Sequence, residues 1–267
     1  MIKYAFYGAA SAFIGLLITG TLIGKANMVP LAIVTICITL GSALWAQLVE
    51  GSSGLMRPFG WYGGVLGVLV GVSISMLLGA NPWLLLGAFS VAAPWIQSAG
   101  RLRCLLQGCC HGRVASDKIG IRYSQPQSRV CKLSSLSGAP VHATPLYSIG
   151  HNLVLAIVMA RIWLLRLDIS LILGVYLILS GLGRFVEESY RGEPQTPMFA
   201  GMRLYQWIAV LSVIAGISVT MFKNTPNAPR PEFSWATIIV SALFGIVALI
   251  ALGVDFPESN RRFARLA

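Results

Sequence analysis

Residues 82–113, PWLLLGAFSVAAPWIQSAGRLRCLLQGCCHGR, join a long apolar run to the beginning of a strongly basic segment. Run 82–100 contains no charged residue, whereas segment 101–132 carries seven basic residues and one acid, Asp117. In the whole chain only 11% of the residues are charged and 56% are hydrophobic. Because charge is so sparse elsewhere, its concentration at the end of one apolar run indicates a functional site rather than a contribution to solubility.

Long uncharged apolar runs determine the fold class. The mean hydropathy of the chain is +0.74, and each run approaches the roughly 20 residues that a helix needs to cross about 30 Å of hydrocarbon. The runs are residues 4–24, 28–49, 59–79, 82–100, 144–165, 168–186, 204–222 and 234–254. Because backbone groups in lipid must be paired within their own segment, we predict an all-α, polytopic membrane bundle of seven to eight transmembrane helices.

The length of the chain fits one integral membrane domain, residues 1–267, without a second globular domain. Run 4–24 is too long for the core of a signal peptide, so we predict that it is the first membrane helix. Residues 101–143 exceed an ordinary connection and predict an extramembrane head loop. The proline-rich residues 223–235 are expected to form a linker to an extra C-terminal apolar helix.

The net charge of +11 favours an anionic partner. In a soluble protein this partner would be nucleic acid, but in a membrane protein we expect anionic lipid headgroups of the bilayer and no nucleic acid. The spacing C-x₄-C-C-H of Cys104, Cys109, Cys110 and His111 differs from the two close ligand pairs that are typical of zinc sites. There is no phosphate-binding Walker loop or dinucleotide fingerprint, so we expect neither a metal nor a cofactor.

Chemically active residues are predicted to meet at one membrane face, because successive helices alternate in direction. The loops after the second, fourth and sixth apolar runs lie on that face, and they bring to it Tyr62, Arg101, His142, Arg184, Glu188, Arg191 and Gln206. Arg184, Glu188 and Arg191 also share one helical face through their i, i+4, i+7 spacing. One arginine at a helix end can extend to the interface without a function, but this group indicates a site.

The excess of arginine at this face suits a phosphate group, which guanidinium groups bind through paired hydrogen bonds. At the depth of the headgroups, that phosphate would belong to a lipid. A transporter is expected to show repeated halves with broken helices near the membrane midplane. The sequence shows no such repeat, and its charges gather at one surface, so the pattern favours an interfacial enzyme.

Six features of the sequence match known motifs in the same order along the chain. They are FYG (6–8), WYGG (61–64), GRLRCLLQGCCHGR (100–113), HATPLY (142–147), RFVEESYRGE (184–193) and Gln206. They resemble, in turn, the WYG, HGG or YGG, GRIGCFLxGCCYG, HPTQLYE and RFxxExxRxD motifs and the seventh-segment glutamine of the bacterial prolipoprotein diacylglyceryl transferase family. The resemblance covers about residues 5–222.

The family transfers a diacylglyceryl group from phosphatidylglycerol to the lipobox cysteine of a prolipoprotein and releases glycerol phosphate. The resemblance implies three partners: phosphatidylglycerol or another anionic phospholipid, the signal-peptide segment of a prolipoprotein, and the lipid bilayer. It implies a catalytic set of Arg101, Arg184, His142, Tyr62 and Glu188. It also implies a substrate-binding set of Tyr7, Gly63, Gly64, Gly100, Gln107, Tyr147, Arg191, Glu193 and Gln206.

The implied roles divide between phosphate binding and proton transfer. Arg101 and Arg184 would hold the lipid phosphate and stabilise the charge that develops on it, with Glu188 and Arg191 orienting them. His142 is the candidate base for the incoming thiol, because an imidazole suits proton removal near neutral pH. The nucleophile is the cysteine of the substrate, so the cysteines of this chain need no catalytic role.

Five positions depart from the family pattern, namely Arg103, Ala143, Pro145, Ser148 and Tyr205. They leave two alternatives open. One is a divergent membrane transferase that moves a phospholipid-derived group to a non-lipoprotein acceptor. The other is a non-catalytic lipid-binding or transport protein.

The orientation in the membrane is predicted from two conflicting signals. The face with the motifs carries fifteen of the twenty lysines and arginines, which by the positive-inside rule places it in the cytoplasm. The family resemblance places the same face outside. Arginines that bind a lipid phosphate add positive charge to the face with the motifs for a reason unrelated to orientation, so the positive-inside rule is less reliable here. We therefore expect a multi-pass protein of the bacterial plasma (inner) membrane with a periplasmic or external active face, the cytoplasmic face being the alternative.

Overall fold

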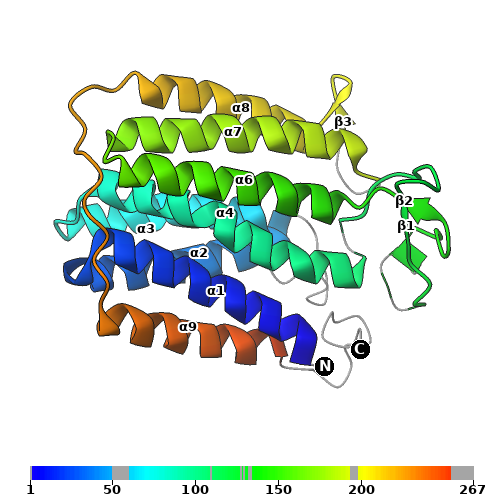
Figure 1. The fold of residues 1–267 in the computed structure, drawn as a ribbon, viewed down its shortest axis with the longest axis horizontal. Coiled ribbons are helices and arrows are strands. Elements are labelled where there is room, and N and C mark those ends of the chain that lie inside the picture. Colours follow the sequence, from blue (N-terminus) through cyan, green and yellow to red (C-terminus); the bar gives the residue numbers. More distant parts are fainter. Residues whose placement is uncertain are drawn as a thin grey trace.

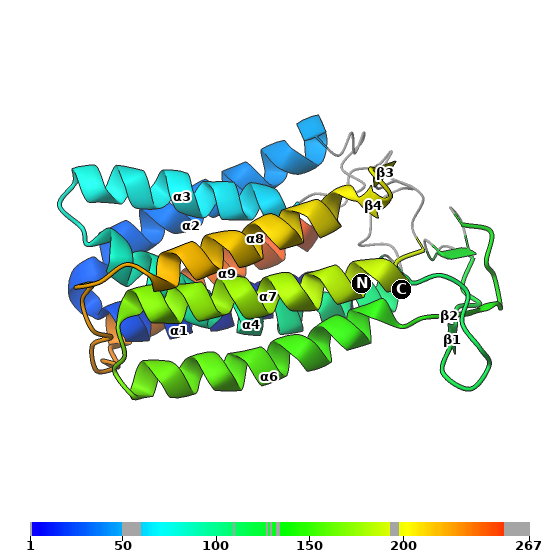
Figure 2. The ribbon, with the colours of Figure 1, turned by 90° about the horizontal axis from the view of Figure 1, so that it is seen from above.

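The computed structural model describes residues 2–49, 60–108, 110–126, 128, 130–131, 134–192 and 198–253. Within these residues the chain forms eight α-helices: α1 (Ile2–Ile23), α2 (Met28–Leu44), α3 (Trp61–Leu77), α4 (Pro82–Gln107), α6 (Thr144–Leu164), α7 (Ile169–Tyr190), α8 (Leu204–Thr220) and α9 (Trp235–Gly253). A 3₁₀ helix, Lys25–Asn27, joins α1 to α2, and a π-helical turn, Trp45–Val49, extends α2. The helices lie side by side in one bundle (Figures 1 and 2), which confirms the predicted all-α architecture.

Helix α4 is longer than the apolar run that predicts it. The sequence suggests an end near Gly100, but the helix continues to Gln107, where Gly108 ends it in the left-handed conformation with a φ of 63°. Its first turn is capped by the side chain of Asn81. Arg101 therefore lies within the helix and not in the predicted loop, so its position is fixed by helix packing.

Four helical segments are long and apolar enough to cross a membrane, and several shorter helices are also apolar. The long segments are Ala5–Ile23, Lys25–Leu48, Thr144–Leu164 and Ile169–Tyr190, and the shorter ones include Trp61–Leu77, Leu204–Thr220 and Trp235–Ile250. Large apolar side chains such as Leu211 on α8 and Ile239 on α9 are exposed, as expected for a surface that faces lipid. The chain is a multi-pass membrane protein.

Small residues let the helices approach closely. At the contact between α2 and α3, a Cβ atom on Gly63 or Gly67 would overlap the backbone of Gly41 or Cys37. Gly64 packs against Ser42 at the same contact. Of the predicted substrate-binding residues, Gly63 and Gly64 are therefore buried between two helices, where a side chain would separate the helices.

Two small two-stranded sheets lie at one end of the bundle, which we call the motif end (Figures 1 and 2). Strand β1 (Ile121–Arg122) pairs antiparallel with β2 (Pro140–Val141), and β3 (Met198–Phe199) pairs antiparallel with β4 (Met202–Arg203).

Main-chain hydrogen bonds fasten the segment after α4 to the end of α7. The Arg113 amide donates to the Tyr190 carbonyl at 2.9 Å, and the Gly192 amide donates to the His111 carbonyl at 3.2 Å. An isolated bridge between Gly112 and Arg191 lies between these two bonds. The ends of α4 and α7 are thereby held together.

The opposite end of the bundle is closed by residues 221–234, which run from α8 to α9 (Figure 1). Trp163 Nε1 donates to the carbonyl of Pro229 at 3.1 Å, and Thr225 Oγ1 donates to Ser170 Oγ at 3.0 Å. Arg166 Nε also donates to the carbonyl of Ala228 at 3.3 Å, so hydrogen bonds to carbonyl and hydroxyl oxygens hold this segment.

Candidate active site at the motif end

The last two turns of α7 and the residue that caps its end bring four charged side chains together: Arg184, Glu187 and Glu188 on the helix, and Arg191 directly after it. Arg184 contacts both acids, with Nη1 3.1 Å from Glu187 Oε1 and Nη2 2.8 Å from Glu188 Oε2. The spacing of Arg184, Glu188 and Arg191 predicts this grouping. The structure adds Glu187 to it.

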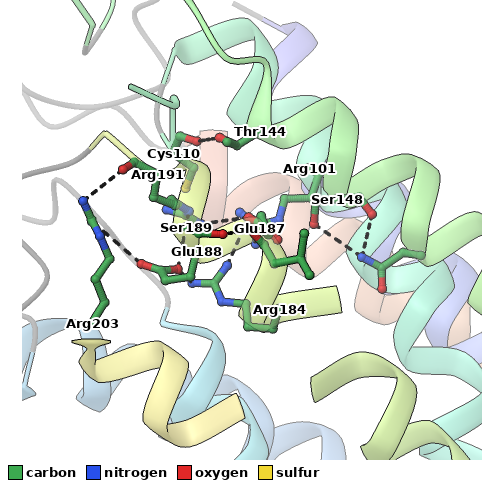
Figure 3. A network of polar contacts seen from close by, with 12 residues as sticks. Arg101, Cys110, Thr144, Ser148, Arg184, Glu187, Glu188, Ser189, Arg191 and Arg203 are labelled. Atoms are coloured by element: carbon green, nitrogen blue, oxygen red, sulfur yellow. Dashed lines mark hydrogen bonds and ion pairs between the residues drawn. The ribbon is translucent and has the colours of Figure 1, made fainter. Parts of the chain in front are cut away.

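The carboxylate of Glu187 binds guanidinium groups from two helices (Figure 3). Its Oε1 lies 3.4 Å from Arg101 Nη2 on α4 and 3.3 Å from Nη2 of Arg191, the residue after α7, in addition to its contact with Arg184 on α7. Only 8% of the Glu187 side chain is exposed. Glu187 therefore brings Arg101 and Arg184, the two predicted phosphate-binding residues, to the same place.

Glu188 is completely buried and collects a second group of arginines. Arg191 Nε lies 3.8 Å from Glu188 Oε2, and Nη1 of Arg203, the last residue of β4, lies 3.9 Å from Glu188 Oε1. Arg203 also donates from Nη2 to the main-chain carbonyl of Arg191 at 2.9 Å. The β3–β4 hairpin thus supplies a fourth arginine.

These six side chains form what we call the arginine cluster: Arg101, Arg184, Arg191 and Arg203 with Glu187 and Glu188. Four guanidinium groups and two carboxylates leave two positive charges over among these described side chains. This net positive charge attracts an anionic group such as a phosphate, which guanidinium groups bind through paired hydrogen bonds. Arg101, Arg184 and Arg203 are 17%, 19% and 22% exposed, which leaves an accessible edge on each.

Aromatic rings from α3 and α8 cover one side of the cluster. The rings of Tyr62 and Tyr205 stack with centroids 4.9 Å apart, and Arg184 Cζ lies 5.3 Å from the centroid of Tyr205. Gln206 Oε1 accepts a hydrogen bond from the main-chain amide of Arg203 at 3.0 Å. Tyr62 therefore lies beside Arg184 as expected, whereas Gln206 caps α8 and positions Arg203.

His142 lies in an aromatic group at the start of α6. Its Nδ1 is 3.1 Å from the hydroxyl of Tyr147, and its ring centroid is 5.0 Å from that of Tyr190. The segment after α4 holds the histidine backbone, because the Gly112 amide donates to the His142 carbonyl at 2.9 Å and the His142 amide donates to the Arg113 carbonyl at 3.0 Å. The position of His142 is thus fixed from both sides.

A cavity of about 580 Å³ lies between α6 and α7 and connects these groups. Its wall includes His142 and Tyr147 from the start of α6 and Arg184 and Glu187 from the end of α7. The candidate base and part of the arginine cluster therefore face the same space.

Two of the other predicted residues lie on α1 and α4, and two fall wholly or partly outside the described part of the chain. Gly100 on α4 faces Ser11 of α1, and Tyr7 lies on α1. The side chain of Gln107 and the whole of Glu193 fall outside the described residues.

Sequence reasoning missed Glu187 and Arg203. Two adjacent acids in an otherwise apolar helix were a usable signal for Glu187, but only Glu188 matches the spacing of the motif. Arg203 directly precedes an apolar run and resembles an ordinary interfacial arginine. Its role depends on the hairpin that turns it toward Glu188.

The bundle and its cluster define a class of protein, a helical membrane protein with a cationic site for an anionic group at one end of the bundle. A family profile described as "Prolipoprotein diacylglyceryl transferase" matches residues 46–222. The chain belongs to this family, and the resemblance seen in its motifs is confirmed.

Two curated relatives carry related names. The chain is 26% identical over 180 residues to "Phosphatidylglycerol--prolipoprotein diacylglyceryl transferase 2" of Clostridium perfringens (strain 13 / Type A), which covers 65% of this chain and 67% of that protein. It is 26% identical over 162 residues to "Phosphatidylglycerol--prolipoprotein diacylglyceryl transferase" of Clostridium tetani (strain Massachusetts / E88), which covers 58% of this chain and 61% of that protein. The matches thus span roughly two thirds of each relative's length.

Proposed function

We propose that this protein transfers the diacylglyceryl group of phosphatidylglycerol to the lipobox cysteine thiol of a prolipoprotein and releases glycerol phosphate. One observation carries the proposal. In a member of this family, the arginine cluster has two surplus positive charges and lies beside a cavity that also contains the candidate base.

The charge of the arginine cluster suits the leaving group better than the substrate. Phosphatidylglycerol carries one negative charge on its phosphodiester. When the sulfur–carbon bond forms and the carbon–oxygen bond to phosphate breaks, the electron pair leaves with the phosphate, which becomes a dianion. Two surplus positive charges therefore attract the departing group more strongly than the bound lipid. This difference lowers the barrier, because only interactions that strengthen in the transition state accelerate the reaction.

The two glutamates orient the arginines. Glu187 holds Arg101 and Arg184 through one oxygen, and Glu188 holds Arg184 from the other side. A guanidinium fixed in this way directs its remaining N–H groups at the phosphate without further ordering. The glutamates act on the positions of the arginines and need not touch the lipid.

His142 receives the thiol proton in this scheme. With Nδ1 bonded to the Tyr147 hydroxyl, Nε2 is the nitrogen that accepts the proton. The thiolate that forms is the stronger nucleophile. The extended signal-peptide segment that carries the cysteine would approach from the side of the head loop, within reach of the bilayer surface.

The direct test uses purified protein in detergent with phosphatidylglycerol and a synthetic lipobox peptide. Mass spectrometry should detect a diacylglyceryl adduct on the cysteine of the peptide. Arg184→Lys keeps the charge but loses the paired hydrogen bonds, so we expect a loss of at least about 100-fold in rate. Arg161→Lys, at the opposite end of α6, is the matched control and should retain the rate. An inactive wild-type protein, or an Arg184→Lys variant with normal activity, would contradict the proposal.

We also propose that the motif end faces the outside of the plasma (inner) membrane, where a prolipoprotein signal segment is presented. Lys118 and Lys223 are both exposed, and they lie close in sequence to the start of β1 and to the end of α8. Figure 1 shows β1 and that end of α8 at opposite ends of the bundle. A membrane-impermeant maleimide added to intact cells (spheroplasts, if there is an outer membrane) should label Lys118→Cys above the wild-type level and should not label Lys223→Cys. The reverse pattern would place the site in the cytoplasm.

A further inference from the structure

The cavity between α6 and α7 extends past the arginine cluster to a row of polar side chains that the proposed reaction does not use. Ser148, His151 and Asn152 reach it from α6, Ser180 from α7 and Gln97 from α4. These residues lie within apolar helices, where polar side chains are costly and usually have a function.

Two of these polar side chains make hydrogen bonds with neighbouring residues. Asn152 Nδ2 donates to the Ser148 carbonyl at 2.8 Å, and Ser180 Oγ donates to the Leu177 carbonyl at 3.4 Å. His151 differs from them, because its Nε2 atom is buried yet finds no hydrogen-bond partner in the described part of the chain. A buried imidazole nitrogen in this state is prepared for a ligand that can share a hydrogen bond with it.

Gly183 makes room for the imidazole. A Cβ atom at this position would overlap the His151 ring, so the ring lies directly against the backbone of α7. Gly183 directly precedes Arg184, and His151 and Arg184 line the same cavity. A lipid whose phosphate binds Arg184 would bring the atoms next to its phosphate to His151.

The surroundings of Nε2 determine what it can bind. Leu182 and Val186 give the cavity apolar walls, which suit an acyl chain. The Nε2–H tautomer of a neutral imidazole is a hydrogen-bond donor, and among apolar walls a neutral acceptor is desolvated at a lower cost than a charged one. In phosphatidylglycerol the ester carbonyl oxygens are neutral acceptors a few bonds from the phosphate, at the point where the acyl chains begin.

We infer that His151 Nε2 donates a hydrogen bond to an ester carbonyl of the phosphatidylglycerol held at the arginine cluster. This subsite makes the protein selective for ester-linked over ether-linked lipid. The inference rests on the proposed function, because it assumes that the lipid phosphate binds Arg184. Ether-linked phosphatidylglycerol still contains the carbon–oxygen bond that breaks, so it remains a chemically competent donor and lacks only the carbonyl acceptors.

The test compares diacyl phosphatidylglycerol with its 1,2-di-O-alkyl analogue of equal chain length, using the same lipobox peptide. Loss of one hydrogen bond to a buried donor predicts a kcat/KM preference on the order of tenfold for the ester lipid. His151→Leu should bring the two rates within about twofold of each other, chiefly by slowing the ester lipid. His151→Gln, which keeps an N–H donor, should retain most of the preference.

Two further variants separate the hydrogen bond from general damage. Gly183→Ala removes no polar atom but displaces the ring, so it should reduce the ester preference as His151→Leu does. Arg161→Ala, at the far end of α6, should leave both rates and their ratio unchanged. Thermal unfolding in detergent would confirm that each variant is folded.

A competition measurement of lipid binding tests the subsite even if the protein transfers neither lipid. Native mass spectrometry of protein mixed with equal amounts of the two lipids should show retention of the diacyl form by the wild type and equal retention by His151→Leu. Equal use and equal retention of the two lipids by the wild type would overturn the inference. An unchanged preference in His151→Leu would overturn it as well. Absence of transfer with both lipids, together with selective retention of the ester lipid, would contradict the proposed function and leave the subsite supported.

Discussion

At the end of the bundle opposite the motifs, buried polar groups are paired mainly with carbonyl and hydroxyl oxygens, whereas at the motif end charged groups are buried against one another. The indole of the fully buried Trp163 donates to a main-chain carbonyl at 3.1 Å, and Thr225 donates to Ser170 at 3.0 Å. In the arginine cluster, by contrast, contacts with the fully buried Glu188 extend to 3.8 and 3.9 Å.

This difference shows which end serves stability. Neutral hydrogen bonds satisfy buried groups at little cost. In a buried ion pair with a long separation, the attraction between the charges offsets less of the free energy lost when they leave water. Well-packed apolar residues in the same place would often stabilise a protein equally well. The opposite end is therefore built to close the bundle, and the motif end retains charges that a ligand uses. Variants at the two ends should separate activity from stability.

The largest effect on activity is expected for Glu187→Gln. Three guanidinium groups lose their shared carboxylate, so we expect kcat/KM to fall about 10³-fold and the free energy of unfolding to fall by roughly 3 kcal/mol. Transfer assays and denaturant unfolding in mixed micelles would measure the two changes. Asp168→Asn, an exposed acid at the opposite end, is the control and should change neither quantity appreciably. Normal activity in Glu187→Gln would show that the cluster is structural.

His142→Gln should lower the transfer rate by about 100-fold, the lower part of the range for a missing general base. The stability of the protein should change little, because the backbone hydrogen bonds of His142 do not involve its side chain. A rate series against pH would show whether the dependence on a neutral imidazole is lost. An unaltered rate and pH profile would assign the base to another group.

Arg203→Met should have an intermediate effect. It removes one of the two surplus charges but leaves the contacts of Glu187 intact, so we expect a loss of about tenfold in kcat/KM, or roughly 1.4 kcal/mol of transition-state stabilisation. Inhibition by glycerol phosphate should weaken in parallel, because the product is the dianion that the surplus charge attracts. A variant that loses activity but keeps its product inhibition would contradict this charge argument.

The smallest effect on activity is expected for Trp163→Phe. The substitution removes one buried hydrogen bond at the opposite end and should lower the free energy of unfolding by about 1–2 kcal/mol. Transfer activity at a permissive temperature should stay within about twofold of the wild type, since no contact with the arginine cluster is altered. If this variant lost activity in proportion to Glu187→Gln, the proposed separation between the two ends would be wrong.

The helices could be predicted from sequence because each depends on the length and composition of its own segment. The end of α4 could not, because Arg101 and its neighbours interrupt the apolar pattern while Glu187, on another helix, provides the partner that keeps Arg101 packed. Motif spacing located Arg184 and Glu188 but gave no sign that Glu187 contacts arginines on two helices. Arg203 depends on a two-residue strand, and such short elements carry almost no local signal.

The main-chain bonds between the segment after α4 and the end of α7 have a consequence for how this protein can vary. They help to fix the distance between the helix that carries Arg101 and the helix that carries Arg184. Because backbone atoms make these bonds, they do not depend on which side chains the neighbouring loop presents. Side chains on residues 114–126 can therefore change to suit a different acceptor peptide, while the distance that must match a phosphate group stays the same.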